Sequence, residues 1–354
     1  MSRFFSTKYK SLEAYTPGEQ PKDLQYTKLN TNESPFPPSE KALAYAAEAA
    51  GRLQLYCDPE CTALTREFAK LYGIGTDEVI FTNGSDDALN FAFMAFCDDT
   101  YPAAFPDITY GFYPVFAELN HVPYTEIPLR EDLTINVDDY CGVNNTIFIA
   151  NPNAPTGIAL SLNEIERILQ TNPDNVVIVD EAYVDFGAQS AVGLIGKYDN
   201  LIVTQTFSKS RSLAGGRLGM AIANKELIRD LNTIKYSTNP YNINTMTQAA
   251  GVGTLLDDDY SKRNCAVIAE NRAYLTAELE KLGFVHTPSS ANFVFAKHPS
   301  YDGGRLYADL KARGVLIRHF TKERIKDYNR ITVGTREQID ILLRNIRELL
   351  EENV

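Results

Sequence analysis

The chain has 354 residues, of which 44% are hydrophobic and 23% charged, as expected of a globular protein that buries its own core. Acidic side chains outnumber basic ones 46 to 34, for a net charge of −12, so the cationic surface needed for broad nucleic-acid or anionic-membrane binding is lacking. No run of 18 apolar residues is present, which excludes a membrane-spanning helix, and the length suggests about two domains.

The cysteines and the N-terminal residues indicate the compartment. The start of the chain lacks the apolar stretch of a secretory signal. The cysteines are five in number and scattered: Cys57, Cys61, Cys97, Cys141 and Cys265. Such a set fits a reduced cytoplasmic protein better than a disulfide framework, and we predict a cytoplasmic location. The four histidines lie far apart and no Cys-x-x-Cys occurs, so we predict no metal site.

The predicted elements describe a sheet with helices on both faces. The first forty residues are irregular and rich in proline, which indicates an arm. Short apolar runs then predict four strands, over residues 79–82, 146–150, 176–179 and 201–204. A helix over 86–97 is apolar on nearly every side, and Ser161 with Glu164 forms the capping box of another. Near-continuous apolar strands separated by helices indicate a parallel sheet.

The pattern changes after about residue 245. Helices are predicted over 260–282, over 306–312 and from a capping box of Thr335 and Gln338, with strands over 292–296, 315–319 and 330–333. This order suggests a smaller α+β domain. We therefore predict an arm of residues 1–40, a large domain of residues 41–250 and a small domain of residues 251–354, packed with part of the arm.

Four polar segments each follow a predicted strand, at the edge where open α/β sheets bind ligands. They are residues 83–86, 151–157, 180–183 and 206–209, the last followed by Arg217. Taken singly, each segment has an ordinary explanation as a turn, a helix cap or an exposed lysine. The sequence contains neither a P-loop nor a strand-anchored Gly-x-Gly-x-x-Gly motif.

Together these segments suit pyridoxal 5'-phosphate. That cofactor needs an amine for a Schiff base, a carboxylate that keeps its ring nitrogen protonated, and an anion cradle for its phosphate. Lys209 can be the amine and Asp180 the carboxylate. The cradle candidates are backbone N–H groups at a predicted helix N-terminus and three polar side chains: Gly84, Ser85 and Asp86, with Thr206, Ser208 and Arg217. Tyr183 can donate to the ring phenolate oxygen, and Tyr110 can stack on the ring.

With these residues the chain resembles the fold-type I pyridoxal-phosphate-dependent aminotransferases of class I and II, and within them the histidinol-phosphate aminotransferases. The likeness covers essentially the whole chain and is carried by residues 17–21, 29–33, 151–157, 179–183, 206–219 and 330–335. It implies an α/β fold whose large domain has a mostly parallel seven-stranded sheet, beside a smaller α+β domain. It also implies a homodimer with shared active sites, in which Tyr56 reaches the cofactor phosphate of the partner subunit.

The resemblance further implies transfer of the amino group of histidinol phosphate to 2-oxoglutarate, in histidine biosynthesis. Lys209, Asp180 and Tyr183 would be the catalytic residues. Arg330, Arg318 and Asn32 would bind the substrates, and a guanidinium fork can donate two hydrogen bonds to either a phosphate or a carboxylate. Three alternatives stay open: an aromatic amino-acid aminotransferase, an amino-acid-phosphate decarboxylase, and a regulatory dimer that only binds the cofactor.

The chain departs from the family pattern at two positions. The family usually has Asn directly before Pro-Thr-Gly, where it contacts the phenolate oxygen, and this chain has Ala154 there. Either Asn153 reaches that oxygen through a shifted backbone or Tyr183 does so alone, and we expect Asn153 to do so. The segment at residues 32–36 ends in Phe36 instead of a tyrosine, which removes a phenolic contact to the substrate.

Overall fold

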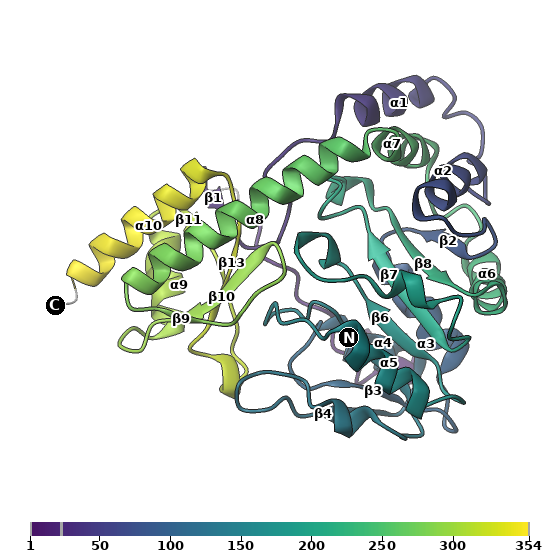
Figure 1. The fold of residues 1–354 in the computed structure, drawn as a ribbon, viewed down its shortest axis with the longest axis horizontal. Coiled ribbons are helices and arrows are strands. Elements are labelled where there is room, and N and C mark those ends of the chain that lie inside the picture. The colour runs from purple at the N-terminus through teal and green to yellow at the C-terminus, as the bar shows by residue number, and fades with distance from the viewer. Residues whose placement is uncertain (1, 22–23, 353–354) are drawn as a thin grey trace.

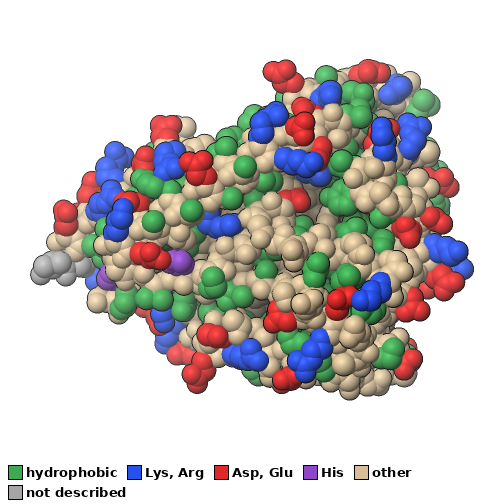
Figure 2. Space-filling view, in the orientation of Figure 1, with side chains coloured by type: hydrophobic (Ala, Val, Ile, Leu, Met, Phe, Trp, Pro, Cys, Tyr) green, Lys and Arg blue, Asp and Glu red, His purple; other side chains and the backbone are tan. Residues whose placement is uncertain are grey.

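The computed structural model describes residues 2–21 and 24–352 (Figure 1). A broad part with a central sheet and a smaller part with a second sheet lie side by side, and the long helix α8 (Asp258–Lys281) extends from one to the other. Basic and acidic side chains of the described residues are interspersed over this face (Figure 2). No helix within these ranges has the length and apolar character to cross a membrane.

The central sheet has seven strands in the order β2-β8-β7-β6-β5-β3-β4. Their bounds are β2 (Val79–Thr82), β3 (Ala103–Pro106), β4 (Tyr124–Ile127), β5 (Thr146–Ala150), β6 (Val177–Asp180), β7 (Leu201–Thr206) and β8 (Gly219–Ala223). Only β8 runs antiparallel to its neighbours. The mostly parallel seven-stranded sheet is thus confirmed, as are the four strands predicted from apolar runs.

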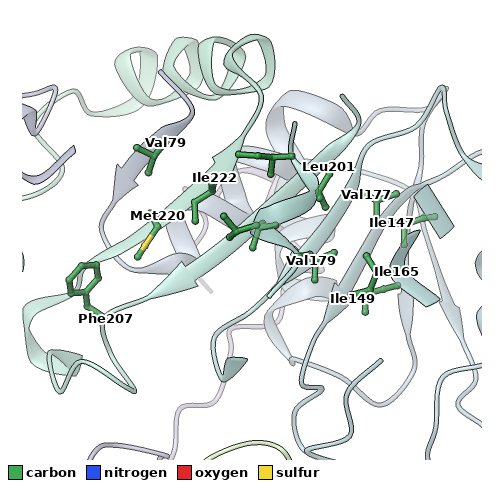
Figure 3. Close-up of a cluster of buried hydrophobic side chains, with 14 of the residues drawn as sticks. Val79, Ile147, Ile149, Ile165, Val177, Val179, Leu201, Phe207, Met220 and Ile222 are labelled. Carbon is green, nitrogen blue, oxygen red and sulfur yellow. The ribbon is translucent and has the colours of Figure 1, made fainter. Parts of the chain in front are cut away.

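Side chains of the inner strands alternate between two buried clusters, which explains why these strands are apolar throughout. Ile147, Val177 and Val179 belong to one cluster (Figure 3), while Phe148 and Ile178 belong to the other. Helices complete the two layers: α2 (Thr62–Tyr72) and α5 (Leu162–Thr171) contribute to the first cluster, and α3 (Ser85–Phe96), α4 (Phe112–Asn120) and α6 (Lys225–Thr238) to the second. The predicted capping box of α5 is present.

The second sheet is antiparallel, in the order β12-β13-β10-β9. Its strands are β9 (Val285–His286), β10 (Phe293–Lys297), β12 (Arg318–His319) and β13 (Asn329–Thr332), and α8, α9 (Gly303–Ala312) and α10 (Arg336–Glu351) pack with them. The capping box of α10 is confirmed. The predicted strand over 315–319 is divided, because β11 (Val315–Leu316) pairs with β1 (Thr27–Lys28) of the arm and only β12 joins the sheet.

Helix α7 (Thr245–Leu255) packs closely on α1 (Glu40–Ala50), since a Cβ at Gly253 would lie 2.6 Å from the Lys41 carbonyl oxygen. A boundary at residue 251 would cut through α7. We therefore propose that the two domains divide in the turn between α7 and α8. Leu29 of the arm is buried in the cluster of the second sheet, which supports the proposal that part of the arm packs with the small domain.

Candidate active site

A cavity of about 1020 Å³ lies between the carboxyl edge of the central sheet, the second sheet and the arm. Most of the predicted site residues line it: Ser85, Asp86, Tyr110, Asp180, Tyr183, Thr206, Ser208, Lys209, Arg217, Arg318 and Arg330. These residues come from segments far apart in the chain that the sheet topology brings to one edge. Parallel strands place their carboxyl ends together, which is why loops after β2, β6 and β7 meet here.

Asp180 ends β6 and is 5% exposed. The Thr204 hydroxyl donates to its Oδ1 at 3.0 Å, and the Tyr113 hydroxyl donates to its Oδ2 at 3.1 Å. Burial raises the pKa of Asp180 from 3.8 to about 6, although both hydrogen bonds act in the opposite direction. Among the described residues, no Lys or Arg forms an ion pair with this carboxylate. The cavity therefore contains a buried carboxylate whose charge a ligand cation would stabilise.

Lys209 follows β7 in a turn whose apolar neighbour, Phe207, is fully buried. Its Nζ donates to the Thr31 carbonyl oxygen at 3.1 Å and lies 5.8 Å from the ring centroid of Tyr183. The Tyr183 ring packs edge-on against Phe293 of β10. An amine and a phenol from the large domain thus face the same space beneath the arm.

The N-terminus of α3 forms the opposite end of the site. Gly84 precedes the helix with φ +81°, and a Cβ there would lie 2.4 Å from Nη2 of Arg217. Asp86 holds that guanidinium, with Nη2 to Oδ2 at 3.0 Å, and accepts a 2.7 Å hydrogen bond from the Tyr110 hydroxyl. A glycine is needed here both for the backbone conformation and for the close approach of the guanidinium.

Two hydroxyl side chains complete this end. The Thr206 hydroxyl donates to Ser208 Oγ at 2.9 Å and accepts from the Ser208 backbone N–H at 3.1 Å. Helix-terminal N–H groups, a guanidinium and two hydroxyls in one place are an arrangement suited to a phosphate.

Two arginines from the second sheet close the cavity. Arg318 of β12 lies directly opposite Arg330 of β13. Nη2 of Arg330 donates to the Asn30 carbonyl oxygen at 3.2 Å, while its buried Nε has no partner among the described residues. Burial lowers the pKa of Arg330, yet a guanidinium stays charged at any ordinary pH. Like charges directly opposite each other repel, and an anion bound between the two guanidinium groups would offset this repulsion.

The structure places two of the predicted site residues, both asparagines, outside the lining of the cavity. Asn153 does not line the cavity: its Oδ1 accepts from the Thr109 hydroxyl at 2.7 Å and its Nδ2 donates to the Ile108 carbonyl at 2.9 Å. Its amide is thus occupied within the protein, and Ala154 lines the cavity instead. Asn32, expected at the substrate, is 1% exposed and also absent from the lining, because its side chain bonds Thr332 and Tyr183.

Two further residues lie outside the cavity. Tyr56 is 84% exposed and stacks on Tyr241, with ring centroids 4.7 Å apart. Phe36 is half-buried and packs against the cluster of the second sheet. Within this chain, neither side chain reaches the site.

Sequence reasoning missed Tyr15, Tyr113 and Thr204. Tyr15 of the arm lines the cavity and stacks on Phe112, with ring centroids 4.0 Å apart, and no local pattern in the proline-rich arm signals this. Tyr113 lies in the first turn of α4 (Phe112–Asn120), three residues after the predicted Tyr110, and the rings of the two tyrosines are in edge contact, with centroids 5.7 Å apart. Thr204 lies beside Asp180 in the β6–β7 pairing.

Comparison with known proteins gives a consistent result. A profile of the family described as aminotransferase class I and II matches residues 25–346. A histidinol-phosphate aminotransferase of Brachyspira hyodysenteriae is 46% identical over 99% of this chain and all of its own, and one of Acinetobacter baumannii is 48% identical over 98% of this chain and 97% of its own. The crystal structure of histidinol-phosphate aminotransferase from Sinorhizobium meliloti in complex with pyridoxal-5'-phosphate superposes with a TM-score of 0.84 at 22% identity, covering 91% of both chains. The chain therefore belongs to the class I and II aminotransferase family.

Proposed function

We propose that this protein is a pyridoxal-phosphate-dependent histidinol-phosphate aminotransferase, which transfers the amino group of histidinol phosphate to 2-oxoglutarate in histidine biosynthesis. The observation that carries the proposal is the meeting of the Lys209 amine and the buried Asp180 carboxylate in one cavity with an anion cradle at its end. The identity of 46–48% with two enzymes of that name, over nearly the full length, supports the choice of substrate.

The cavity fits the cofactor by its own chemistry. Asp180 is a buried carboxylate suited to a protonated ring nitrogen. The α3 N-terminus, Arg217, Thr206 and Ser208 suit its phosphate. Among the residues that the structure describes, the only hydrogen-bond acceptor of Lys209 Nζ is a backbone carbonyl, so its amine can be released at little cost.

When bound, pyridoxal phosphate supplies an electron-withdrawing ring that stabilises negative charge on the substrate carbon bearing the amine. Asp180 keeps the proton on the ring nitrogen, since a charge-assisted hydrogen bond in a buried place favours the protonated ring. Nζ of Lys209 removes the proton from that substrate carbon as general base and later returns a proton as general acid.

Arg330 and Arg318 bind the far end of both substrates. Histidinol phosphate presents a phosphate and 2-oxoglutarate presents a carboxylate, and the planar guanidinium fork bonds either one. The unpartnered Nε of Arg330 supports this assignment, because a buried donor without an acceptor is costly unless a ligand supplies one.

A homodimer belongs to the proposal. Tyr56 and Tyr241 form an exposed aromatic pair, and nearby Leu53 and Leu55 are 55% and 63% exposed. Apolar surface of this kind favours contact with a second copy, through which Tyr56 would reach the partner's cofactor phosphate. The cytoplasmic location stays a prediction.

A substrate comparison tests the proposal. The purified protein with cofactor is assayed with histidinol phosphate, phenylalanine and threonine phosphate, each with 2-oxoglutarate, following both glutamate and carbon dioxide. We expect histidinol phosphate to give the highest kcat/KM and no carbon dioxide. Preference for phenylalanine would identify an aromatic aminotransferase, and release of carbon dioxide from threonine phosphate a decarboxylase. A cofactor absorbance that glutamate leaves unchanged would identify a protein that only binds the cofactor.

A further inference from the structure

The site has one side-chain donor fewer for the phenolate oxygen of the cofactor than the family pattern provides. Ala154 cannot donate, and the Asn153 amide is held by Thr109 and Ile108. Of the two groups expected to contact that oxygen, only the Tyr183 hydroxyl lines the cavity. A hydroxyl has a single proton, so its direction decides whether the oxygen receives a hydrogen bond at all.

Asn32 determines the direction of that proton. The Thr332 hydroxyl accepts from the Asn32 backbone N–H at 3.0 Å and donates to Asn32 Oδ1 at 3.0 Å. This leaves Asn32 Nδ2 facing Tyr183, to whose hydroxyl oxygen it donates at 3.1 Å. The Asn292 side chain bonds the Asn32 carbonyl oxygen at 3.0 Å and fixes the backbone as well. An amide nitrogen cannot accept a hydrogen bond, so the Tyr183 hydroxyl cannot donate its proton to the Asn32 amide nitrogen.

We propose that Asn32 is a positioning residue: by donating to the Tyr183 oxygen, it directs the Tyr183 proton to the phenolate oxygen of the cofactor and so replaces the donor that Ala154 lacks. The inference rests on the proposed function. It also explains why an asparagine from the arm is buried against Thr332 of the small domain and Tyr183 of the large one.

The test measures the pH at which the visible absorbance of the bound cofactor changes, a property set by how strongly the phenolate oxygen is hydrogen-bonded. Asn32 has φ +56°, so Asn32→Gly removes the amide without straining the backbone. Asn32→Asp keeps the shape but offers Tyr183 an acceptor in place of a donor. Tyr183→Phe removes the donor itself, and Asn271→Ala is the matched control, because Asn271 is a buried asparagine of α8, outside the cavity lining, whose amide donates to the Gly334 carbonyl.

We expect the midpoint to rise by about 1–2 pH units in Tyr183→Phe, since a hydrogen bond to a charged group shifts a titration by about that much. Asn32→Asp should give a rise of similar size, and Asn32→Gly a smaller rise in the same direction. The double variant Asn32→Gly/Tyr183→Phe should match Tyr183→Phe, and Asn271→Ala should match the parent.

An unmoved midpoint in both Asn32 variants, with a shifted one in Tyr183→Phe, would overturn the role of Asn32 and leave the proposed function standing. A further rise in the double variant would also overturn it, because Asn32 would then act independently of Tyr183. Failure of the parent protein to show any cofactor absorbance would overturn the proposed function, and the inference with it.

Discussion

Arg318 lies directly opposite Arg330 in the pairing of β12 with β13, so two guanidinium groups share one face of the small sheet at the mouth of the cavity. Arg330, which is half-buried, lies over the rings of Phe293 and Phe320, at 5.3 and 5.7 Å from their centroids. The ring faces partly offset the desolvation of the charge, but its Nε has no acceptor among the residues that the structure describes. This relationship favours a ligand anion and leads to the first prediction.

Replacing Arg330 should weaken the binding of both substrates. Arg330→Ala should raise the apparent KM of histidinol phosphate and of 2-oxoglutarate by about one to two decades each, because a charge-assisted hydrogen bond is worth about 1.5–3 kcal/mol. Arg330→Lys should still raise both, since it keeps the charge but loses the planar fork. Steady-state kinetics of both half reactions measure this, with exposed Arg344→Ala on α10 as control. If the apparent KM rises in only one half reaction, Arg330 does not bind both the phosphate of histidinol phosphate and the carboxylate of 2-oxoglutarate.

Replacing Lys209 should abolish transamination while the fold persists. Within the described part of the chain its Nζ makes one hydrogen bond, to the Thr31 carbonyl, so Lys209→Ala should lose little stability. Exposed Lys225→Ala should retain the parent's turnover and unfolding midpoint. Turnover is followed by glutamate formation and folding by thermal unfolding. Full turnover of Lys209→Ala would refute the assignment of this amine.

The stability of the cofactor-free protein should depend on Asp180 and on pH. Its pKa is raised from 3.8 to about 6 by burial, so the folded state binds the proton more tightly than the unfolded chain. Stability therefore falls as pH rises from about 4 to 6 and stays reduced above that range. Asp180→Asn should remove this loss, making the cofactor-free variant about 1–3 kcal/mol more stable than the parent at pH 8, with the difference vanishing towards pH 4.

Urea unfolding of the two cofactor-free proteins at several pH values checks this expectation. With the cofactor bound, the parent should be the more active protein, and Asp180→Asn should lose turnover by orders of magnitude. A cofactor-free variant less stable than the parent at pH 8 would mean that the carboxylate serves mainly to hold Tyr113 and Thr204.

The fold was predictable where the chain is apolar without interruption. β2, β5, β6 and β7 have every residue buried, and such runs identify a covered sheet. β3 and β8 were missed because Ala, Gly and Pro dominate them, and these residues have low strand propensity. β4 was missed because it is an edge strand whose side chains are mostly exposed.

The grouping of the candidate site residues was predictable where the strand order alone decides it. Asp180 ends β6 and Lys209 lies just after β7, and the neighbouring ends of these two strands bring the residues together. The positions of Asn153 and Asn32 outside the cavity lining could not be predicted, because the direction of their amides is set by Thr109 and by Thr332, the latter 300 residues away from Asn32. Contacts of that kind leave no local trace in the sequence.

Replacing Gly84 should lower the affinity for the cofactor phosphate, in addition to straining the backbone. Its φ of +81° and a Cβ position 2.4 Å from Arg217 Nη2 mean that Gly84→Ala strains the backbone and also displaces the guanidinium. Gly73 is a matched control, because it has φ +69° at the end of α2 with nothing within 4 Å of the added Cβ. Gly73→Ala should cost about 1–2 kcal/mol of stability, the usual cost of a left-handed conformation for a residue with a Cβ. Gly84→Ala should cost about 1–3 kcal/mol, because φ +81° with ψ 164° is a conformation that essentially only glycine adopts. Only Gly84→Ala should lower the affinity for pyridoxal phosphate, by about tenfold or more, because a charge-assisted contact to the phosphate is lost.

Titration of the cofactor-free proteins with pyridoxal phosphate, followed by absorbance, measures the affinity, and urea unfolding measures the stability. Equal cofactor affinity in the two variants would show that Arg217 does not bind the phosphate from its place beside Gly84.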